Sequence, residues 1–264
     1  MSEVQPAYAP PVQPTPGAPI PSAFVAVVSY TLRACLPAKR WFGVLLPCAG
    51  ALLFGWLTLV ADSSDQTEAF AHISRQGLFG LILPLACLVI GDAVLGADAR
   101  AGTFQLTWLS PVSFATIAFG RWLGGWFVAL VTVTPAFALA PIIAGQPEAA
   151  GPMAVAAATG SAAYIALFLL IGVLVKRSTI WALAVVLIGE RLVGAALSGV
   201  GQISPMWEAQ QTFVGLWDDG GHFIARDGMP DGTAAVVRLV LVTIICLGVA
   251  TWRLGRMRPL SGDD

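Results

Sequence analysis

Charged residues are scarce in this sequence: Asp, Glu, Lys and Arg make up only 11% of its 264 residues, whereas 57% are hydrophobic. Soluble domains carry about 25% charged residues, so the chain has less than half of the usual polar coating. Its mean hydropathy is +0.79. This composition argues against a soluble domain and predicts a protein embedded in a lipid bilayer. The net charge of −1 says nothing about nucleic acid, but the sequence has no basic block that would follow a phosphate backbone, so we expect no nucleic-acid partner.

The motifs of several catalytic sites are absent as well. The sequence has no G-x-x-x-x-G-K-[ST] loop to hold nucleotide phosphates and no H-E-x-x-H pair to hold zinc. The two histidines, His72 and His222, are far apart in sequence, and the four cysteines form no C-x-x-C pair. We therefore expect no metal or cofactor in this chain, and we interpret the cysteines as small apolar residues within helices.

An intramembrane aspartyl protease needs a separate check, because Asp92 follows Ile90 and Gly91 at the end of an apolar run. That chemistry requires two aspartates within the membrane that share a proton. No other long apolar run contains an aspartate, so Asp92 is interpreted as a charge at a helix end. We expect that the chain is not an enzyme.

Long apolar runs are the main feature that the sequence does have. A spanning helix needs about 20 mostly apolar residues. Six runs of this kind cover residues 42–61, 77–95, 117–144, 153–175, 179–200 and 234–252. The third is long enough to tilt, or to break at Pro135 or Pro141. The prediction is an all-α integral membrane protein with six transmembrane helices.

The distribution of Lys and Arg predicts the orientation, since cytoplasmic loops carry an excess of both. With cytoplasmic termini, most of the 14 Lys and Arg residues fall near the inner ends of the spans. The outer side then receives Arg75, Arg226 and Arg238, and Arg191 lies within a span. We therefore expect a multi-pass protein of the cytoplasmic membrane with both termini in the cytoplasm.

Two segments at the ends of the chain are predicted to lie outside the bilayer. Residues 1–21 are rich in proline and lack the apolar core of a signal peptide, so we expect a disordered cytoplasmic tail. Residues 259–264 form a second predicted cytoplasmic tail.

Residues 22–40 place apolar residues at helical spacing behind Ser22 and predict an amphipathic helix on the inner membrane surface. A simple extension of the first span into the cytosol stays open for that segment.

The longest predicted outer connection, residues 201–233, contains a helix start at Ser204-Pro205. Serine caps a helix, and proline is favoured at its first position. The residues that follow are too apolar for a free loop and too few to span the bilayer. We predict a short re-entrant helix that dips into the outer leaflet between spans five and six, with its tryptophans at interfacial depth.

The most specific pattern lies in the inner loop between the second and third runs. Residues 98–113 read DARAGTFQLTWLSPVS, and Gly120-Arg121 follows. This loop resembles that of ABC-2-type permeases, the membrane-spanning subunits of a class of ATP-driven transporters. In that family a charged residue precedes a Gly-Thr-apolar triplet, Pro-Val-Ser follows a leucine, and Gly-Lys or Gly-Arg opens the third span. The matching residues are Gly102, Thr103, Phe104, Leu109, Pro111, Val112, Ser113, Gly120 and Arg121.

The resemblance extends to the layout of residues 22–258 and implies a function. The loop would form a compact helix that seats in a cleft of a cytosolic ABC ATP-binding subunit, where ATP and Mg²⁺ are bound. Phe104, Leu106 and Trp108 would make apolar contacts, although they could instead sink into the membrane interface. Asp98 and Arg100 would be charges that steer this contact. The family often has glutamate at these positions, so which of the two charges steers the contact here stays open. The resemblance also implies a dimer of permease subunits, from two copies or with a paralogue, that exports a hydrophobic or amphipathic substrate.

A pair of ionisable residues, Glu190 and Arg191, lies about halfway along the run 179–200. A charge at that depth is costly and usually faces the bundle interior with a partner or a functional role. Neighbouring helical residues point about 100° apart, so the two cannot face the same helix directly. A structural pair and a contact with substrate both stay open.

A second class of function also stays open: a carrier driven by an ion gradient, or a membrane assembly factor without transport activity. A gradient-driven carrier should contain inverted repeats and further buried charges at mid-membrane. The sequence has no convincing internal repeat and one such charged pair.

Overall fold

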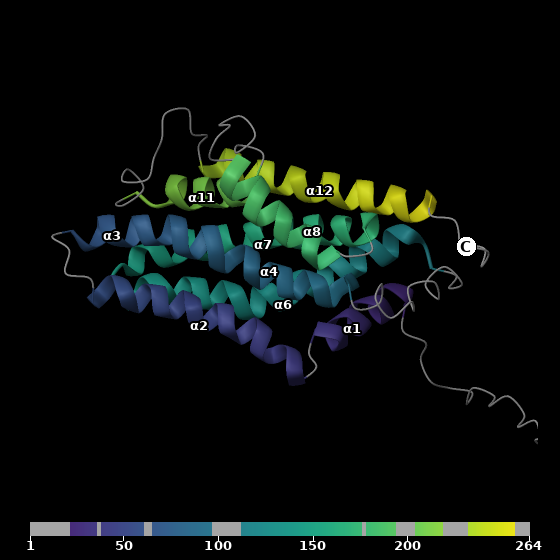
Figure 1. Ribbon diagram of the computed structural model, residues 1–264, viewed down its shortest axis with the longest axis horizontal. Coiled ribbons are helices and arrows are strands. Elements are labelled where there is room, and N and C mark those ends of the chain that lie inside the picture. Colours follow the sequence, from purple (N-terminus) through teal and green to yellow (C-terminus); the bar gives the residue numbers. More distant parts are fainter. Residues whose placement is uncertain are drawn as a thin grey trace, which may run out of the picture.

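The computed structural model describes residues 22–35, 38–60, 65–96, 112–175, 178–193, 204–218 and 232–256. Within these ranges the chain forms helices and turns, without a strand. Five helices are long and apolar enough to cross a membrane, and they run roughly along the long axis of the molecule (Figure 1). The predicted all-α architecture with transmembrane helices is therefore confirmed for five of the six predicted spans.

The five helices match the first four predicted runs and the last one. They are α2 (Ala38–Val60), a continuous helix from Gln66 to Gly96, α6 (Phe114–Ile143), α7 (Ala150–Leu174) with the 3₁₀ turn η4 (Pro147–Ala149) before it, and α12 (Gly232–Arg256). The continuous helix consists of α3 (Gln66–Ile73), the π-helical η1 (Ser74–Ile82), α4 (Leu83–Gly91) and the π-helical η2 (Asp92–Gly96). We call it helix 66–96, and we name the two ends of the bundle the α3 end and the η2 end.

The predicted span 179–200 is described only in its first part. It consists of α8 (Ser178–Ala184) and the π-helical η5 (Val185–Val193), which together form an apolar helix too short to count among the five. Residues 194–200 lie outside the described residues, so a sixth crossing stays a prediction.

Helix 66–96 begins eleven residues before the apolar run that starts at residue 77, so the predicted start of this span was placed too late. Asp65 caps the helix: its carboxylate accepts hydrogen bonds from the backbone N–H groups of Thr67 at 2.9 Å and Glu68 at 3.2 Å. An acidic cap followed three residues later by glutamate is a known start signal. The third span also stays unbroken, because α6 continues through Pro135 and Pro141.

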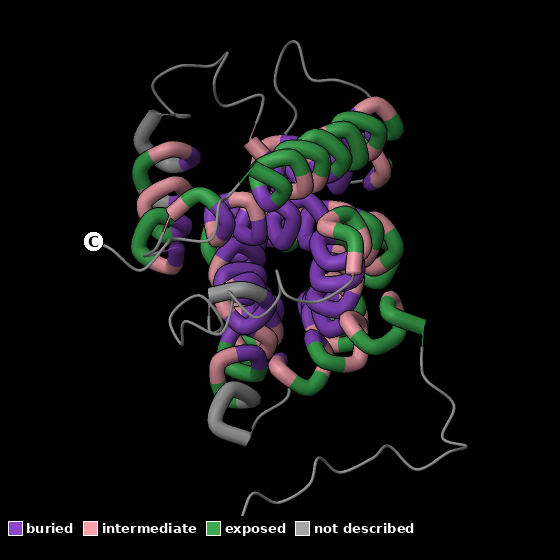
Figure 2. Tube along the Cα trace, turned by 90° about the vertical axis from the view of Figure 1, so that its right-hand side faces the viewer, coloured by how far each residue is buried: buried purple, intermediate pink, exposed green. Residues whose placement is uncertain are grey.

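Helix 66–96 and α7 form the centre of the bundle. In their most apolar stretches 72% and 67% of residues are buried, against 28% in both α2 and α12. Figure 2 shows the buried residues turned toward the interior and the exposed ones outward. The antiparallel helices α6 and α7 are joined by two indole N–H groups: Trp122 donates to the carbonyl of Ala162 and Trp126 to that of Ala158, each at 2.9 Å.

The predicted N-terminal helix is present as α1 (Ala23–Cys35), which packs along α6 near the η2 end (Figure 1). The Phe24 and Phe119 rings stack with centroids 5.9 Å apart. Two glycines of α6 allow the close approach: a Cβ at Gly120 would lie 2.9 Å from a methyl of Val27, and one at Gly124 would lie 2.8 Å from Cβ of Thr31.

The helix predicted to begin at Ser204-Pro205 is present as α11 (Pro205–Leu216), with Ser204 as its cap. It lies against α7, α12 and η1. Trp217, predicted to lie at interfacial depth, is buried in the structure, and its ring is 5.8 Å from that of Phe70. Whether α11 re-enters the outer leaflet stays a prediction.

The contact between α2 and α6 gives a test of the packing. A Cβ added at Gly55 would overlap the backbone carbonyl of Ala140, which cannot move aside as a flexible side chain could. Gly55→Ala should therefore lower the free energy of unfolding by about 1–3 kcal/mol, measured by unfolding in mixed micelles.

The matched control is Gly248→Ala on α12, where a Cβ meets nothing within 4 Å. Because alanine favours a helix over glycine, this change should leave stability equal or higher. Equal unfolding of the two variants would contradict the described approach of α2 to α6.

Candidate functional site

The predicted contact loop falls outside the described residues, and the structure describes only the elements on either side of it. The loop residues concerned are Asp98, Arg100, Gly102, Thr103, Phe104, Leu106, Trp108, Leu109 and Pro111. Helix 66–96 ends just before this segment, and α6 begins just after it. The site is therefore described from the contacts that hold these two ends.

Ser113, a residue of the sequence motif, determines where α6 begins. Its hydroxyl oxygen accepts a hydrogen bond from the backbone N–H of Thr116 at 3.2 Å and lies 2.7 Å from the Thr116 hydroxyl. A serine at this cap satisfies an N–H group that has no partner within the helix. The last residue of the motif's Pro-Val-Ser thus has a direct structural function.

Arg121, which follows Gly120 in the motif, connects the two sides of the loop. Its side chain is buried, and one guanidinium nitrogen donates to the carbonyl of Val94 at 2.8 Å. Val94 lies in the last turn of helix 66–96, where carbonyl groups lack partners within the helix and a cation is favoured. The guanidinium also lies 5.6 Å from the centre of the Tyr30 ring of α1. Sequence reasoning identified Arg121 as part of the motif but not its contacts.

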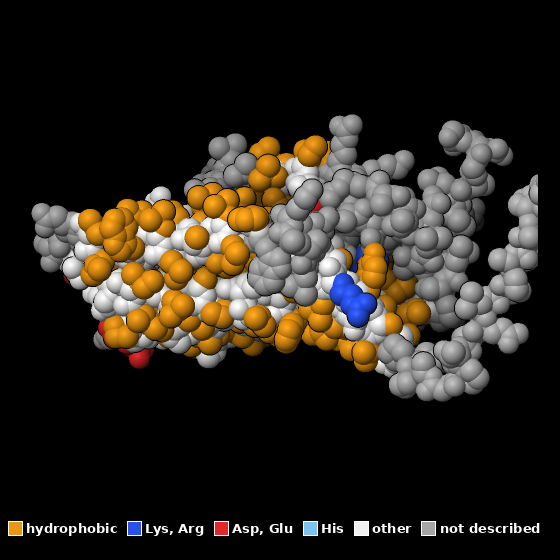
Figure 3. Space-filling view, turned by 90° about the horizontal axis from the view of Figure 1, so that it is seen from below, with side chains coloured by type: hydrophobic (Ala, Val, Ile, Leu, Met, Phe, Trp, Pro, Cys, Tyr) orange, Lys and Arg blue, Asp and Glu red, His pale blue; other side chains and the backbone are white. Residues whose placement is uncertain are grey.

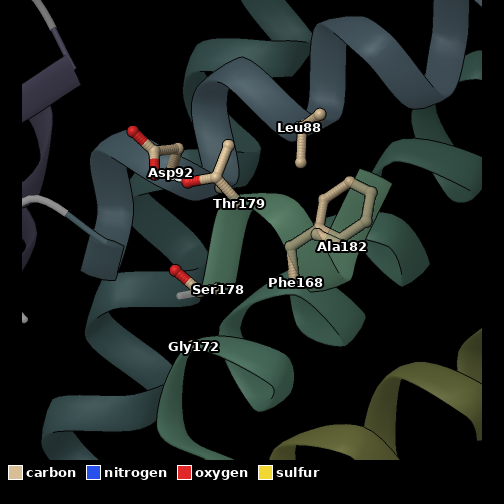
Figure 4. Close-up of a pocket in the computed structure, with 8 residues that line it drawn as sticks. Leu88, Asp92, Phe168, Gly172, Ser178, Thr179 and Ala182 are labelled. Carbon is tan, nitrogen blue, oxygen red and sulfur yellow. Dashed lines mark hydrogen bonds between the residues drawn. The ribbon is translucent and has the colours of Figure 1, made fainter. Parts of the chain in front are cut away.

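Asp92 connects the same helix end to α8. Its carboxylate accepts a hydrogen bond from the hydroxyl of Thr179 at 2.5 Å. Figure 4 shows the two side chains facing each other at one side of a small pocket, with Phe168 and Ala182 on the other side and Ser178 and Gly172 below. Asp92 was interpreted from the sequence as a charge at a helix end, and it lies in η2, the last segment before the loop.

Glu190 lies in η5 and is buried among hydroxyl groups. The Tyr164 hydroxyl of α7 donates to one carboxylate oxygen at 2.6 Å, and the Ser204 hydroxyl donates to the other at 2.9 Å. Ser204 also caps α11 by accepting from the backbone N–H of Trp207 at 3.4 Å. A carboxylate is favoured at a helix N-terminus. Glu190 therefore fastens the start of α11 to the middle of α7.

The predicted pair of Glu190 and Arg191 is described for one member only, since the Arg191 side chain lies outside the described residues. Tyr164 and Ser204 were not predicted as partners of Glu190. A tyrosine within an apolar run, 26 residues before a buried glutamate, carries no sequence signal that would assign the contact. The glutamate alone was recognisable, from the cost of a charge in an apolar run.

A further ion pair joins α11 to α12 and was also missed. The buried carboxylate of Glu208 accepts from the half-exposed guanidinium of Arg238 at 3.3 Å. Burial raises the pKa of Glu208, and the hydrogen bond and charge of Arg238 offset part of this rise. Within the described part of the chain, the second Glu208 oxygen and both polar atoms of the buried Gln211 amide have no hydrogen-bond partner.

A comparison of the sequence with models of known protein families finds no match, and a search of curated proteins finds none either.

The contact between Tyr164 and Glu190 can be measured with a double-mutant cycle of Tyr164→Phe and Glu190→Gln. A hydrogen bond to a charged group contributes about 1.5–3 kcal/mol to stability. Removal of one partner leaves the other buried without a hydrogen bond, which lowers stability by a similar amount. We expect the two changes to be non-additive by about 1–2 kcal/mol in unfolding experiments in mixed micelles. Thr251 is distant in sequence, and its hydroxyl bonds within its own helix. The loss of stability caused by Thr251→Val should therefore add to that caused by either change. Strict additivity of Tyr164→Phe and Glu190→Gln would show that the contact carries no energy.

Proposed function

We propose that this chain is the membrane-spanning permease subunit of an ATP-driven ABC-2-type transporter of the cytoplasmic membrane. Two permease subunits, either two copies or this chain with a paralogue, would form the pathway, and a separate cytosolic ABC subunit would bind and hydrolyse ATP. The cargo is a hydrophobic or amphipathic molecule moved outward. In this orientation the η2 end of the bundle faces the cytoplasm.

The observation that carries the proposal is the hydrogen bond from Arg121 to the Val94 carbonyl. It ties the end of helix 66–96 to α6 and so fixes the base of the segment between them, which contains the motif residues from Gly102 to Pro111. Gly125 adds a close contact at the same base, since a Cβ there would lie 2.6 Å from a methyl of Val94. A loop with such a base transmits a push to both helices at once, because neither helix end can yield independently.

A second set of contacts extends from the loop toward the centre of the bundle. Asp92 binds Thr179 at the start of the helix formed by α8 and η5, and Glu190 near its end binds Ser204 at the start of α11. Movement of η2 would shift α8, and with it the Glu190 carboxylate that binds Ser204, the cap of α11. Asp92 and Glu190 both lie in π-helical segments, which occur frequently at functional sites.

The direction of the helices supports an even number of crossings. Trp122 contacts Ala162 and Trp126 contacts Ala158, so α6 and α7 are antiparallel. The end of α12 approaches the start of α6, where a Cβ at Gly255 would lie 3.7 Å from the Phe114 ring. Therefore α7 and α12 run in the same direction, and the chain between them has to return to the α3 end. Six crossings with both ends of the chain in the cytoplasm agree with this geometry.

A carrier driven by an ion gradient is a second candidate, and Glu190 favours it. A buried carboxylate with two hydroxyl partners is a group that could take up and release a proton during transport. Such a carrier has no use for a loop that binds an ATPase, so the loop distinguishes the two candidates.

The first test is affinity co-purification of this chain from its native membranes in mild detergent, with mass spectrometry to identify a captured ATP-binding subunit. The wild type should capture that subunit in stoichiometric amount, and Phe104→Asp should abolish capture because an apolar contact is replaced by a charge. Gln105→Asp is the matched control: it adds the same charge at the next residue without removing an apolar side chain. Equal capture by both variants would refute the role of Phe104, and recovery of no nucleotide-hydrolysing partner would favour the gradient-driven carrier.

The base of the loop gives a second prediction. Arg121→Met keeps most of the apolar stem but removes every donor to the Val94 carbonyl. We expect the variant to capture the ATPase as the wild type does but to lose transport in proteoliposomes, because the loop would no longer move both helices together. Arg253→Met on α12, an exposed arginine that takes no part in the contact between Arg121 and Val94, should retain transport. Full transport by Arg121→Met would contradict the proposed coupling through this residue.

A further inference from the structure

A hollow opens on the surface of the bundle where α1, α2 and α6 meet. Its volume is about 180 Å³. The two outermost side chains, Phe127 and Val131, are 54% and 59% exposed, so the hollow is open to the surroundings. The lining side chains that matter here are Leu32, Cys35, Val44, Phe127, Val131 and Thr132.

The chemistry of the lining is that of hydrocarbon. The Thr132 hydroxyl donates to the carbonyl of Val128 in its own helix at 2.7 Å, and the Cys48 thiol donates to the Thr132 carbonyl at 3.5 Å. An engineered apolar cavity of about 150 Å³ stays free of water and binds benzene. A hollow of this size and lining therefore accepts an apolar segment of a few carbon atoms and offers nothing to water.

The walls of the hollow are fixed, so it cannot simply close. Gly120 and Gly124 hold α1 in direct contact with α6 on one side. On the other side α2 is held to α6 by the Cys48 contact and, further along, by the close approach of Gly55 to Ala140. Unfilled space between fixed walls loses the dispersion contacts that a filling group would supply.

The charges beside the hollow are of one sign. Residues 22–61 contain no acidic residue, whereas Arg33, Lys39 and Arg40 in the same range are basic. Arg33, the residue after Leu32 of the lining, is exposed. In Figure 3 the described part of this face carries many hydrophobic side chains, with basic side chains toward the η2 end and acidic ones at the α3 end. A partner at the hollow therefore has an apolar part and an anionic part.

We propose that the hollow holds an acyl chain of an anionic phospholipid from the leaflet beside α1, with the lipid phosphate at the exposed Arg33 of α1. Phe127 to Thr132 lie further along α6 than Gly124, so a chain that enters beside Arg33 extends toward the membrane interior. Lipid occupancy wedges the three helices that border the base of the predicted loop. The site does not depend on the proposed transport function, and each can fail without the other.

The test uses the full chain in nanodiscs that contain a phosphatidylglycerol with a diazirine in one acyl chain. After irradiation, labelled peptides are identified by mass spectrometry. We expect labelling to concentrate on the segments that contain Leu32, Cys35 and residues 127–132. Val131→Trp fills the hollow from an exposed position and should displace about two methylenes of the acyl chain. The loss of their burial corresponds to a roughly tenfold lower affinity, so this labelling should fall by roughly tenfold.

The matched control is Ile244→Trp on α12, which is as exposed as Val131, at 59%, but lies outside the hollow. It should leave the labelling of α1 and α6 unchanged. Phosphatidylcholine with the same reactive chain should label the hollow several-fold less. Labelling spread evenly over all exposed helices, or unaffected by Val131→Trp, would overturn the site. Equal labelling by both lipids would overturn the assignment of its anionic headgroup.

Discussion

Hydrocarbon supplies no hydrogen-bond partners, so a polar group that enters the bilayer is costly unless it is paired within the protein. The backbone meets this constraint by forming helices. Side-chain hydroxyls meet it by bonding to the carbonyl four residues earlier, as in Thr31, Thr132, Thr159, Thr243 and Thr251. The two indoles of α6 meet it by donating to carbonyls of α7. Polar groups that pair within or between neighbouring helices in this way leave the outer surface free for lipid.

The same constraint explains why the remaining polar contacts gather at helix ends and irregular turns. Carbonyl and N–H groups without a helical partner occur there, and charged side chains can satisfy them. Arg121 binds a carbonyl at the end of helix 66–96, and Ser204, held by Glu190, caps the start of α11. Each of these contacts ties the end of one helix to the side of another. Rotation of one helix would therefore disturb its partner, whereas apolar contacts along the helix sides can slide.

The sequence predicted features that depend on local composition and missed those that depend on pairing across the bundle. Apolar runs identified five spanning helices, and Ser204-Pro205 identified the start of α11. The start of helix 66–96 was recoverable from Asp65 and Glu68, but the polar residues that follow resembled a loop. In contrast, Tyr164 is 26 residues from Glu190, and Arg121 is 27 residues from Val94. No periodicity reports a partner at that distance, so geometry alone could assign it.

The contacts of the buried polar groups distinguish the two candidate functions in physical terms. A proton carrier needs its titrating group to meet water from each side in turn, so the contacts of that group have to break during transport. The Glu190 carboxylate has both oxygens occupied, by the hydroxyls of Tyr164 in α7 and of Ser204 at the start of α11, and opening it would break this link between the two helices. An ATP-driven permease needs the opposite property, a connection that persists while helices move together. The contacts from Asp92 to Thr179 and from Glu190 to Tyr164 and Ser204 each join separate helical elements, and this is the arrangement that we infer such a permease would use.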